Sequence, residues 1–224
     1  MSIKNEIEIL KNSKAKNADD FEKLILSVGL NGELLHEQPN EFNQFYGKGI
    51  KIWQYPNQLS KFAEKISKLE IDSYLEIGCR FGGTFIFNSE VLSKNNPEIN
   101  IYACDIIPMS EIISEYSSYR KLQYLNISSR EDKFKNICLE IKPKFVFIDG
   151  DHSYEGVKND FLIFENMLET KYIAFHDISS DVCPGVVKMW DEMKKDKRFE
   201  TFEFTEQYET VKGNYLGIGL AIRK

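Results

Sequence analysis

The segment FVFIDGDHSYEGVKND, residues 145–160, follows directly on an apolar run and contains four carboxylates and one of the three histidines of the chain. A second apolar run, YIAFHD at 172–177, also ends in a histidine and an aspartate. If the two runs are neighbouring parallel strands, their ends bring Asp149, His176 and Asp177 into one small volume. Carboxylates that close need a compensating cation, so the pattern predicts a divalent metal site. Oxygen ligands favour Mg²⁺, whereas an imidazole ligand shifts the preference toward Mn²⁺ or another transition metal.

His152 lies three residues beyond Asp149, at the start of the next expected helix. An imidazole titrates near neutral pH and suits a general base for a substrate hydroxyl whose pKa a metal has lowered. The remaining acids of the segment are expected to cap or solvate that helix: Asp151, Glu155 and Asp160. Two structural alternatives stay open, namely a His152 satisfied by a local hydrogen bond and a buried His176 bonded to backbone. The third histidine, His36, lies in a polar stretch, and no chemistry is assigned to it.

A second group of candidates lies in YLEIGCRFGGTF, at the junction of another expected strand and helix. Its spacing G-x-x-x-G-G differs from the dinucleotide-binding G-x-G-x-x-G, and Glu76, two residues before the first glycine, would repel a pyrophosphate. Glycines at this position let a ligand approach the backbone at the end of a strand. Asp105 ends the following strand, where a carboxylate can bind both hydroxyls of a ribose. Together these residues favour a nucleoside with a cationic tail. Alternatively, Gly82 and Gly83 serve only a tight turn and Glu76 caps a helix.

YLEIGCRFGGTF followed by YACD resembles the first two motifs of class I S-adenosylmethionine-dependent methyltransferases, a resemblance that covers roughly residues 55–223. It implies that Glu76 and Gly78 lie along the methionine part of S-adenosyl-L-methionine, that Asp105 holds the ribose, and that NISS at 126–129 passes near the adenine. The residues expected to bind the cofactor are Gln54, Tyr55, Glu76, Gly78, Arg80, Gly82, Gly83, Thr84, Asp105, Ser128 and Asp149.

IDGDHSYEGVKND with the later HD resembles, more narrowly, the sugar O-methyltransferases of macrolide biosynthesis (the macrocin and mycinamicin enzymes) and the cephalosporin-hydroxylase-like group. This resemblance implies Mg²⁺ ligands at Asp149 and Asp177 and a general base at His152. The chain departs from the group's pattern at His176, which stands where the group carries a metal-binding glutamate. The predicted metal ligands are therefore Asp149, His176 and Asp177.

From residue 71 onward, short β-type runs alternate with helical patterns, which indicates an α/β fold with a mostly parallel sheet covered on both faces. The resemblance implies a Rossmann-like, seven-stranded sheet that ends in an antiparallel hairpin. The expected strands are 73–78, 99–105, 122–126, 144–149, 172–177, 199–204 and 215–223, and the expected helices between them are 83–94, 109–118, 130–141, 153–168 and 185–195. Residues 1–50 are expected to form a helical N-terminal extension and residues 51–224 the methyltransferase domain.

Three local expectations concern the surroundings of the site. Asn57 is a candidate N-cap for the helix that follows it. Trp53 and Tyr55 either pack the extension onto the sheet or form a wall of the cofactor or sugar pocket. The segment SSDVCPGVVKMW is expected to form a loop over the acceptor site, with Pro184 in the first turn of the next helix.

The bulk composition excludes several classes of protein. A net charge of −6 and a pI near 5.3 argue against a nucleic-acid binder and favour a small-molecule or glycan partner. The four cysteines form no C-x-x-C pair, which suits reduced thiols. The sequence shows no signal-peptide pattern and no apolar run of membrane-spanning length, so a cytoplasmic protein that contacts no membrane is expected. Homo-oligomerisation stays open.

The sequence thus predicts a methyltransferase that moves a methyl group from S-adenosyl-L-methionine to a hydroxyl of a small polar acceptor, such as a sugar or glycan-like natural product. Metal assistance, by Mg²⁺ or Mn²⁺, and a histidine base are part of the prediction. The alternatives are a metal-independent N-methyltransferase, a non-catalytic S-adenosylmethionine-binding module, and a metal-dependent hydrolase or hydroxylase that uses Asp149 and Asp177.

Overall fold

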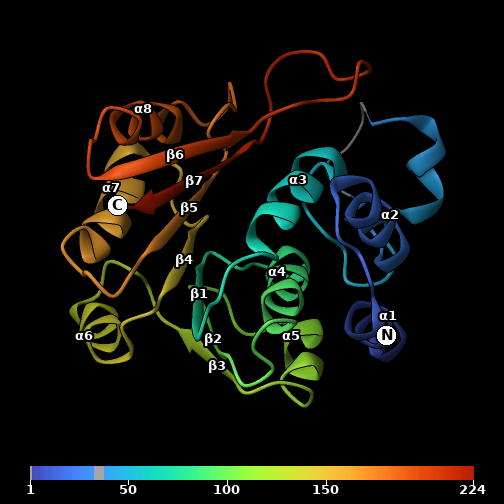
Figure 1. Cartoon of the computed structure of the whole chain (residues 1–224), viewed down its shortest axis with the longest axis horizontal. Helices are drawn as coiled ribbons and strands as arrows, with labels where there is room; N and C mark the ends of the chain where they lie inside the picture. The colour runs from blue at the N-terminus through green and yellow to red at the C-terminus, as the bar shows by residue number, and fades with distance from the viewer. Residues whose placement is uncertain (1, 33–37) are drawn as a thin grey trace.

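The computed structural model describes residues 2–32 and 38–224, so that His36 lies outside the described residues. The chain is built around a seven-stranded sheet with helices on both faces (Figure 1). The strands are β1 (Ser73–Ile77), β2 (Asn100–Asp105), β3 (Leu122–Asn126), β4 (Phe145–Ile148), β5 (Tyr172–His176), β6 (Phe199–Phe204) and β7 (Ile218–Arg223). They lie in the order β3-β2-β1-β4-β5-β7-β6. The strand β7 pairs antiparallel with β5 and with β6, whereas the other neighbouring strands pair in parallel. The predicted Rossmann-like sheet with an antiparallel C-terminal hairpin is confirmed.

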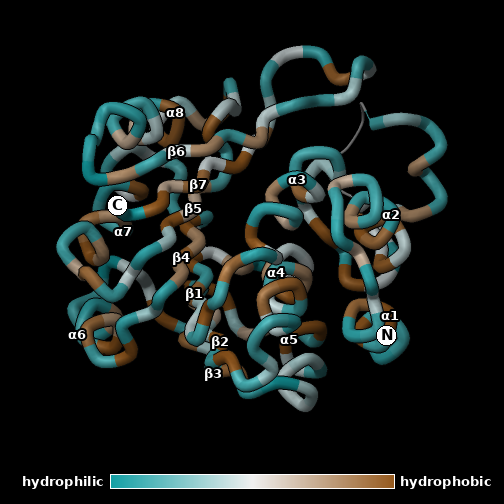
Figure 2. The backbone as a smooth tube through the Cα atoms, in the orientation of Figure 1, coloured by the Kyte–Doolittle hydropathy of each residue, from teal (hydrophilic) through white to brown (hydrophobic). Residues whose placement is uncertain are grey.

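Both faces of the central strands are buried. Successive side chains of a strand point to opposite faces, so each central strand contributes to two core clusters. In β4, Phe145 and Phe147 belong to one core cluster, whereas Val146 and Ile148 belong to the other. A strand buried on both faces appears in the sequence as a continuous apolar run, as FVFI does. Figure 2 shows hydrophobic segments along the central strands and hydrophilic ones in many outer loops.

The helices divide between the two faces of the sheet (Figure 1). One face carries α6 (Asp132–Ile141), α7 (Tyr154–Phe164) and α8 (Pro184–Met193), and the other carries α3 (Pro56–Ile66), α4 (Gly83–Ser93) and α5 (Glu111–Tyr116). The expectation that α7 extends to residue 168 is wrong. The helix ends at Phe164, the chain turns, and Met167 is buried while Leu168 is exposed.

The N-terminal residues form α1 (Lys4–Asn12), α2 (Ala18–Val28) and a 3₁₀ helix, η1 (Asn40–Phe45). Asn17 caps α2 with its side chain. Leu30 forms parallel β-bridges with Tyr46 and Ile52. Apolar side chains of α1 and α2 lie in the same core cluster as residues of β1 and β4. The division of the chain after residue 50 stays a prediction.

Asn57 does not cap the helix that follows it, contrary to expectation. The helix α3 begins at Pro56 with Tyr55 in the N-cap position, so Asn57 is already helical. Proline suits the first helical position because its φ is preset and its missing N–H would be unpaired there in any case. Asn57 instead donates its backbone N–H to the hydroxyl of Tyr208 at 3.0 Å.

Two predictions from composition can be compared with the structure. All four cysteines are buried and free, as expected for packed thiols. None of the helices within residues 2–32 and 38–224 combines the length and hydropathy of a membrane-crossing segment.

Candidate active site

The carboxyl ends of β1, β2, β4 and β5 open onto a cavity of about 870 Å³. Most of the predicted site residues line it: Glu76, Gly78, Arg80, Gly82, Gly83, Thr84, Asp105, Ser128, Asp149, His152, His176 and Asp177. Gln54 and Tyr55 are buried and do not line the cavity, whereas Trp53 does. Sequence reasoning missed further lining residues, among them Asn31, Lys51, Arg130, Tyr215 and Leu216. Their positions gave no motif signal, because they come from separate loops.

Glu76 is the most deeply buried acid of the cavity, with 1% of its surface exposed. It lies in β1, and the hydroxyl of Tyr74 donates a hydrogen bond to its Oε2. Burial raises the pKa of Glu76 to about 8, even though the bond from Tyr74 favours the charged form. A carboxyl group in this state gains from a cationic ligand, because the ligand's charge compensates for the lost hydration.

The glycines after β1 are required by contacts within the protein. Gly78 and Gly82 have positive φ angles of 86° and 95°. A Cβ on Gly78 would lie 2.1 Å from the carbonyl oxygen of Asp149, and one on Gly83 would lie 2.5 Å from the carbonyl oxygen of Ile50. Close contacts with the backbone of distant segments account for Gly78 and Gly83, and the positive φ accounts for Gly82, so close ligand approach is not needed to explain these glycines.

Asp105 lies at the end of β2 and organises the loops on both sides. It accepts hydrogen bonds from the backbone N–H of Arg80 at 2.7 Å and of Ile107 at 3.1 Å. The guanidinium of Arg80 lies 3.7 Å from the ring centre of Trp53, which is a cation–π contact across the cavity wall. The next residue, Ile106, is 74% exposed although it lines the cavity. An acid beside an apolar surface suits a nucleoside, which has both hydroxyls and a flat base.

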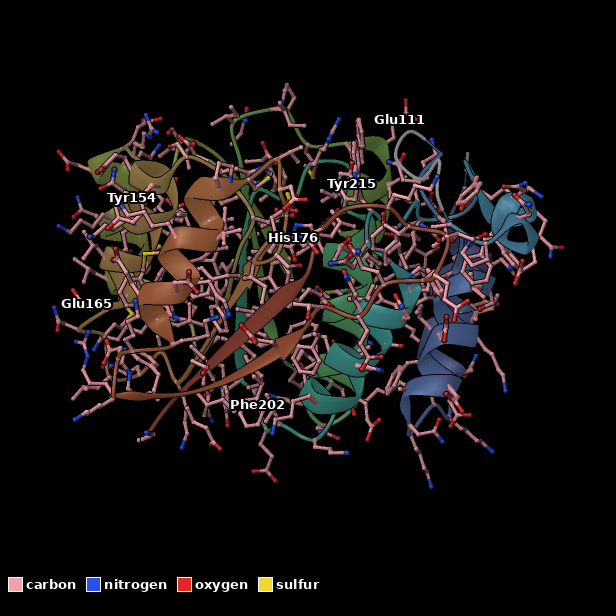
Figure 3. All side chains as sticks on the ribbon, turned by 90° about the horizontal axis from the view of Figure 1, so that it is seen from above. Glu111, Tyr154, Glu165, His176, Phe202 and Tyr215 are labelled. Carbon is pink, nitrogen blue, oxygen red and sulfur yellow. The ribbon has the colours of Figure 1, made fainter. Side chains whose placement is uncertain are left out.

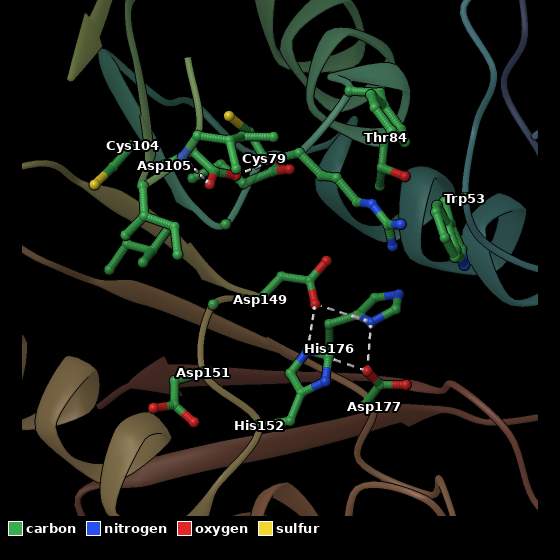
Figure 4. Close-up of a pocket in the computed structure, with 18 of the residues that line it drawn as sticks. Trp53, Cys79, Thr84, Cys104, Asp105, Asp149, Asp151, His152, His176 and Asp177 are labelled. Carbon is green, nitrogen blue, oxygen red and sulfur yellow. Dashed lines mark hydrogen bonds and ion pairs between the residues drawn. The ribbon is translucent and has the colours of Figure 1, made fainter. Parts of the chain in front are cut away.

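Two carboxylates and two imidazoles form a ring at the ends of β4 and β5 (Figure 4). Nδ1 of His176 lies 3.2 Å from Oδ1 of Asp149 and 3.2 Å from Oδ2 of Asp177. Nε2 of His152 lies 3.3 Å and 3.5 Å from the same two oxygen atoms. The predicted meeting of the two strand ends is thus observed. Viewed from above, His176 lies between Tyr154 and Tyr215 (Figure 3).

Against the effect of burial, the carboxylates of this ring shift the pKa values of its histidines toward the charged form, and the histidines do the same for Asp149. Burial alone would lower the pKa of His176, but Asp149 and Asp177 raise it well above its ordinary value. Burial alone would raise the pKa of Asp149, yet the neighbouring histidines hold it below its usual range. The hydrogen bond to Asp149 raises the pKa of His152.

His152 is the accessible member of the ring, since 43% of its side chain is exposed whereas only 5% of His176 is. Its Nδ1 lies 3.4 Å from Sγ of Cys183, in the segment between β5 and α8. This segment also supplies Ser180 and Val182 to the cavity wall. His152 can therefore be reached by a ligand in the cavity, whereas His176 is enclosed.

His176 contacts a residue that sequence reasoning placed at the cofactor. Its Nε2 lies 3.1 Å from Nε2 of Gln54, which is fully buried. The other end of the Gln54 amide accepts the backbone N–H of Tyr55 at 2.6 Å. The alternative of a His176 bonded to backbone is not what the structure contains, since its contacts are side chains.

The ring fits a divalent cation. Asp149, His176 and Asp177 each offer one ligand atom, and these atoms lie within 4.8 Å of one another. Among the described residues, Nδ1 of His176 finds no aligned hydrogen-bond partner, despite the two nearby carboxylates. A deprotonated Nδ1 at this position would require a partner, and a cation between the three atoms would be one. A second candidate group, His152, Asp177 and Cys183, shares Asp177 with the first.

The loop between β6 and β7 closes one side of the cavity. Tyr215 and Leu216 precede β7, although a strand was expected from residue 215, and both line the cavity. Leu216 packs against Tyr55, and the hydroxyl of Tyr208 donates to Glu22 of α2. The N-terminal helices therefore support this wall through contacts that no local pattern could reveal.

Asp160 departs from the expectation that it solvates α7. It is 1% exposed, and burial raises its pKa to about 6. Asp151 and Glu155 are exposed as expected, and Asp151 accepts the backbone N–H of Ser153, the N-cap of α7.

Comparison with known families identifies the chain. Residues 41–209 match the family model described as Rhamnosyl O-methyltransferase/CmcI. The chain belongs to this family. The family description names an O-methyltransferase, which agrees with the predicted class of enzyme. No curated protein matches the chain.

Two solved structures with TM-scores above 0.5 agree on the fold. The cofactor-bound Rv0187 from MTB has a TM-score of 0.56 at 11% identity, covering 77% of this chain and 81% of the other. The O-methyltransferase TomG from Streptomyces achromogenes, involved in tomaymycin synthesis and solved with SAM, has a TM-score of 0.52 at 11% identity, covering 77% and 82%. MycE, the mycinamycin-pathway methyltransferase solved with Mg and SAH, gives a TM-score of 0.47 at 13% identity, covering 71% of this chain. The chain spans less than half, 46%, of the MycE chain.

Proposed function

We propose that this methyltransferase moves a methyl group from S-adenosyl-L-methionine to a hydroxyl of a small polar acceptor, with a sugar or glycan-like natural product as the substrate class. The observation that carries the proposal is that one cavity is lined both by Glu76 with Asp105 and by Asp149 with His152. The first pair suits a cationic nucleoside and the second suits proton removal from an alcohol. The description of the family, rhamnosyl O-methyltransferase, supports a sugar acceptor.

On the donor side, we propose that Glu76 faces the ammonium group of the methionine moiety, which would restore its charge in a buried position. Asp105 would accept hydrogen bonds from the ribose hydroxyls, because the loops it organises hold its carboxylate at the edge of the cavity. Ser128 lies in the segment after β3 and would border the adenine. A bound S-adenosylmethionine supplies an electrophilic methyl group on a sulfonium.

On the acceptor side, we propose that His152 removes the hydroxyl proton as the methyl group is transferred. Its exposure lets an acceptor reach it, and its contact with Asp149 stabilises the imidazolium that forms. Asp149, His176 and Asp177 would hold a divalent cation, which lowers the pKa of a neighbouring hydroxyl when bound. Val182 and Tyr215 would flank the acceptor as an apolar rim around this polar centre.

Methyl transfer to an alcohol can be tested directly. The full chain is incubated with S-adenosylmethionine carrying a labelled methyl group, with a divalent salt and with a panel of deoxyhexose glycosides, and methyl ethers are detected by mass spectrometry. We expect His152→Ala to lower the rate by about 10²–10⁴-fold while the affinity for S-adenosylhomocysteine changes less than about threefold. The control is Glu155→Gln, an exposed acid of the same segment.

Three outcomes would contradict the proposal. An unchanged rate in the His152→Ala variant would show that His152 takes no part in methyl transfer. Methylation of amines but not of alcohols, unaffected by chelators, would favour the metal-independent N-methyltransferase. Binding of the cofactor without transfer to any acceptor would favour the non-catalytic module.

A further inference from the structure

We propose that the cluster of Asp149, His176 and Asp177 selects a first-row transition-metal ion, such as Mn²⁺, over Mg²⁺, and that the amide of Gln54 controls the tautomer of His176 on which metal binding depends. The inference rests on the proposed function, because it specifies the metal of that same site. It concerns the residue at which this chain departs from the sugar O-methyltransferases that it resembles.

The first support is the geometry of the ligand atoms, which suits a small divalent ion of either kind. Two atoms bound to one ion at about 2.1 Å lie roughly 3.0 Å apart at a right angle and roughly 3.4 Å apart at the tetrahedral angle. Nδ1 of His176 lies 3.2 Å from a carboxylate oxygen of Asp149 and 3.2 Å from one of Asp177, between these two values. An ordinary ion pair would align the N–H with one carboxylate. Within the described part of the chain, Nδ1 lies at the same distance from both carboxylates and is aligned with neither for a hydrogen bond.

The second support is the chemistry of the donor set. Mg²⁺ prefers six oxygen ligands and keeps several waters, whereas imidazole nitrogen suits transition ions. A histidine in place of a glutamate also removes one negative charge from the site, which weakens a purely electrostatic Mg²⁺ site more than one with a nitrogen bond. Because His176 is only 5% exposed, it cannot turn away to let water take its place.

The partner of the other ring nitrogen sets a condition for metal binding. A histidine that binds a metal through Nδ1 carries its proton on Nε2 and donates it to an outer partner. In His176 that nitrogen faces the amide of Gln54 at 3.1 Å. The amide presents its nitrogen there, since its oxygen accepts the backbone N–H of Tyr55. This orientation keeps the proton of His176 on Nδ1, so metal binding requires the Gln54 amide to turn over.

Gln54→Glu makes this requirement testable. A glutamate has an acceptor at both ends, so it can accept the Tyr55 N–H and the His176 Nε2–H at the same time. Gln54→Leu keeps a similar volume and has no acceptor. We expect the glutamate variant to bind Mn²⁺ at least as tightly as the natural chain, and the leucine variant to bind it about 10-fold or more weakly.

The experiment uses untagged, chelator-stripped full chain. Loss of the free Mn²⁺ signal in electron paramagnetic resonance gives the Mn²⁺ affinity, and competition gives the Mg²⁺ affinity. We expect Mn²⁺ to bind at least about 100-fold more tightly, with nitrogen modulation in the pulsed spectrum. His176→Glu should abolish that modulation and lower the preference for Mn²⁺ at least about 10-fold. Asp151→Asn, a neighbouring acid outside the cluster, and His152→Gln should both keep the modulation.

Circular dichroism and S-adenosylhomocysteine affinity verify that each variant is folded. Equal affinities for Mn²⁺ and Mg²⁺, absence of bound Mn²⁺, or nitrogen modulation that survives in His176→Glu would each overturn the inference. So would a Gln54→Glu variant that binds Mn²⁺ more than about 10-fold more weakly, since the outer-partner role predicts the opposite. None of these results touches methyl transfer, so the proposed function is judged by its own assay.

Discussion

The buried carboxyl group of Glu76 should make the stability of the folded chain depend on pH in a range where few side chains titrate. Its pKa is about 8 in the folded chain and 4.5 in an ordinary environment. A raised pKa means that the folded state holds the proton more tightly than the unfolded state. The stability from this group is therefore complete below about pH 4.5 and is lost as the pH rises through about 8.

The size of the effect follows from 1.36 kcal/mol for each pKa unit. Near pH 6 the group lies about two units below its folded pKa and contributes about 2.7 kcal/mol, and near pH 8 it is half ionised and contributes about 0.4 kcal/mol. Glu76→Gln mimics the protonated form and keeps an acceptor for the Tyr74 hydroxyl. Relative to the natural chain, the variant should thus gain about 2 kcal/mol in unfolding free energy between these two pH values.

Urea denaturation of the ligand-free chain across this pH range measures the difference, with the slope m checked for constancy. Glu155→Gln, which changes an exposed carboxylate, should follow the natural chain at every pH. Glu76→Gln should also bind S-adenosylmethionine more weakly, because no carboxylate then faces the ammonium group. The difference in unfolding free energy between Glu76→Gln and the natural chain should change with pH. If it changes by less than about 0.5 kcal/mol between pH 6 and pH 8, the carboxyl group is not desolvated and the reasoning is refuted.

Two further predictions concern contacts that hold the sheet and its helices. Gly78→Ala should lower the unfolding free energy by more than about 3 kcal/mol, because its Cβ would lie 2.1 Å from the carbonyl oxygen of Asp149 at a φ of +86°. Gly213→Ala, with a φ of +87° but no contact closer than 3.5 Å, should lose only about 1 kcal/mol in the same urea assay, and equal losses would contradict the steric argument. Arg120→Met should cost about 3–5 kcal/mol, because Glu90, 1% exposed, loses its two bonds from Arg120 of 2.7 and 2.8 Å. Lys142 pairs with Glu169, which is half exposed, so Lys142→Met should change the thermal stability very little. Similar losses in Arg120→Met and Lys142→Met would show that burial of the partner does not determine the cost of losing an ion pair.

The order of strands and helices could be predicted because each element carries its own local pattern. FVFI is continuous and apolar because both faces of β4 are covered, and Asp149 follows this strand where the chain leaves the core. The ends of parallel strands share one edge of a sheet, so Asp149 and Asp177 could be expected to meet without any coordinates. Element boundaries were less certain, as Leu168 and Asn57 show, since a turn ends α7 after Phe164 and a proline begins α3 before Asn57.

The environment of each site residue was decided by the tertiary structure. Gln54 was expected at the cofactor, yet it lies beside His176, 122 positions away in the sequence. Tyr208 connects the loop before β7 to α2, and the glycines of the first turn are required by the backbone of distant segments. The amino-acid sequence by itself determined which chemical groups reach the edge of the sheet, because periodicity and strand ends depend on short segments of neighbouring residues. Folding determined how buried those groups are and what they contact, because burial and partners depend on residues far apart in the sequence.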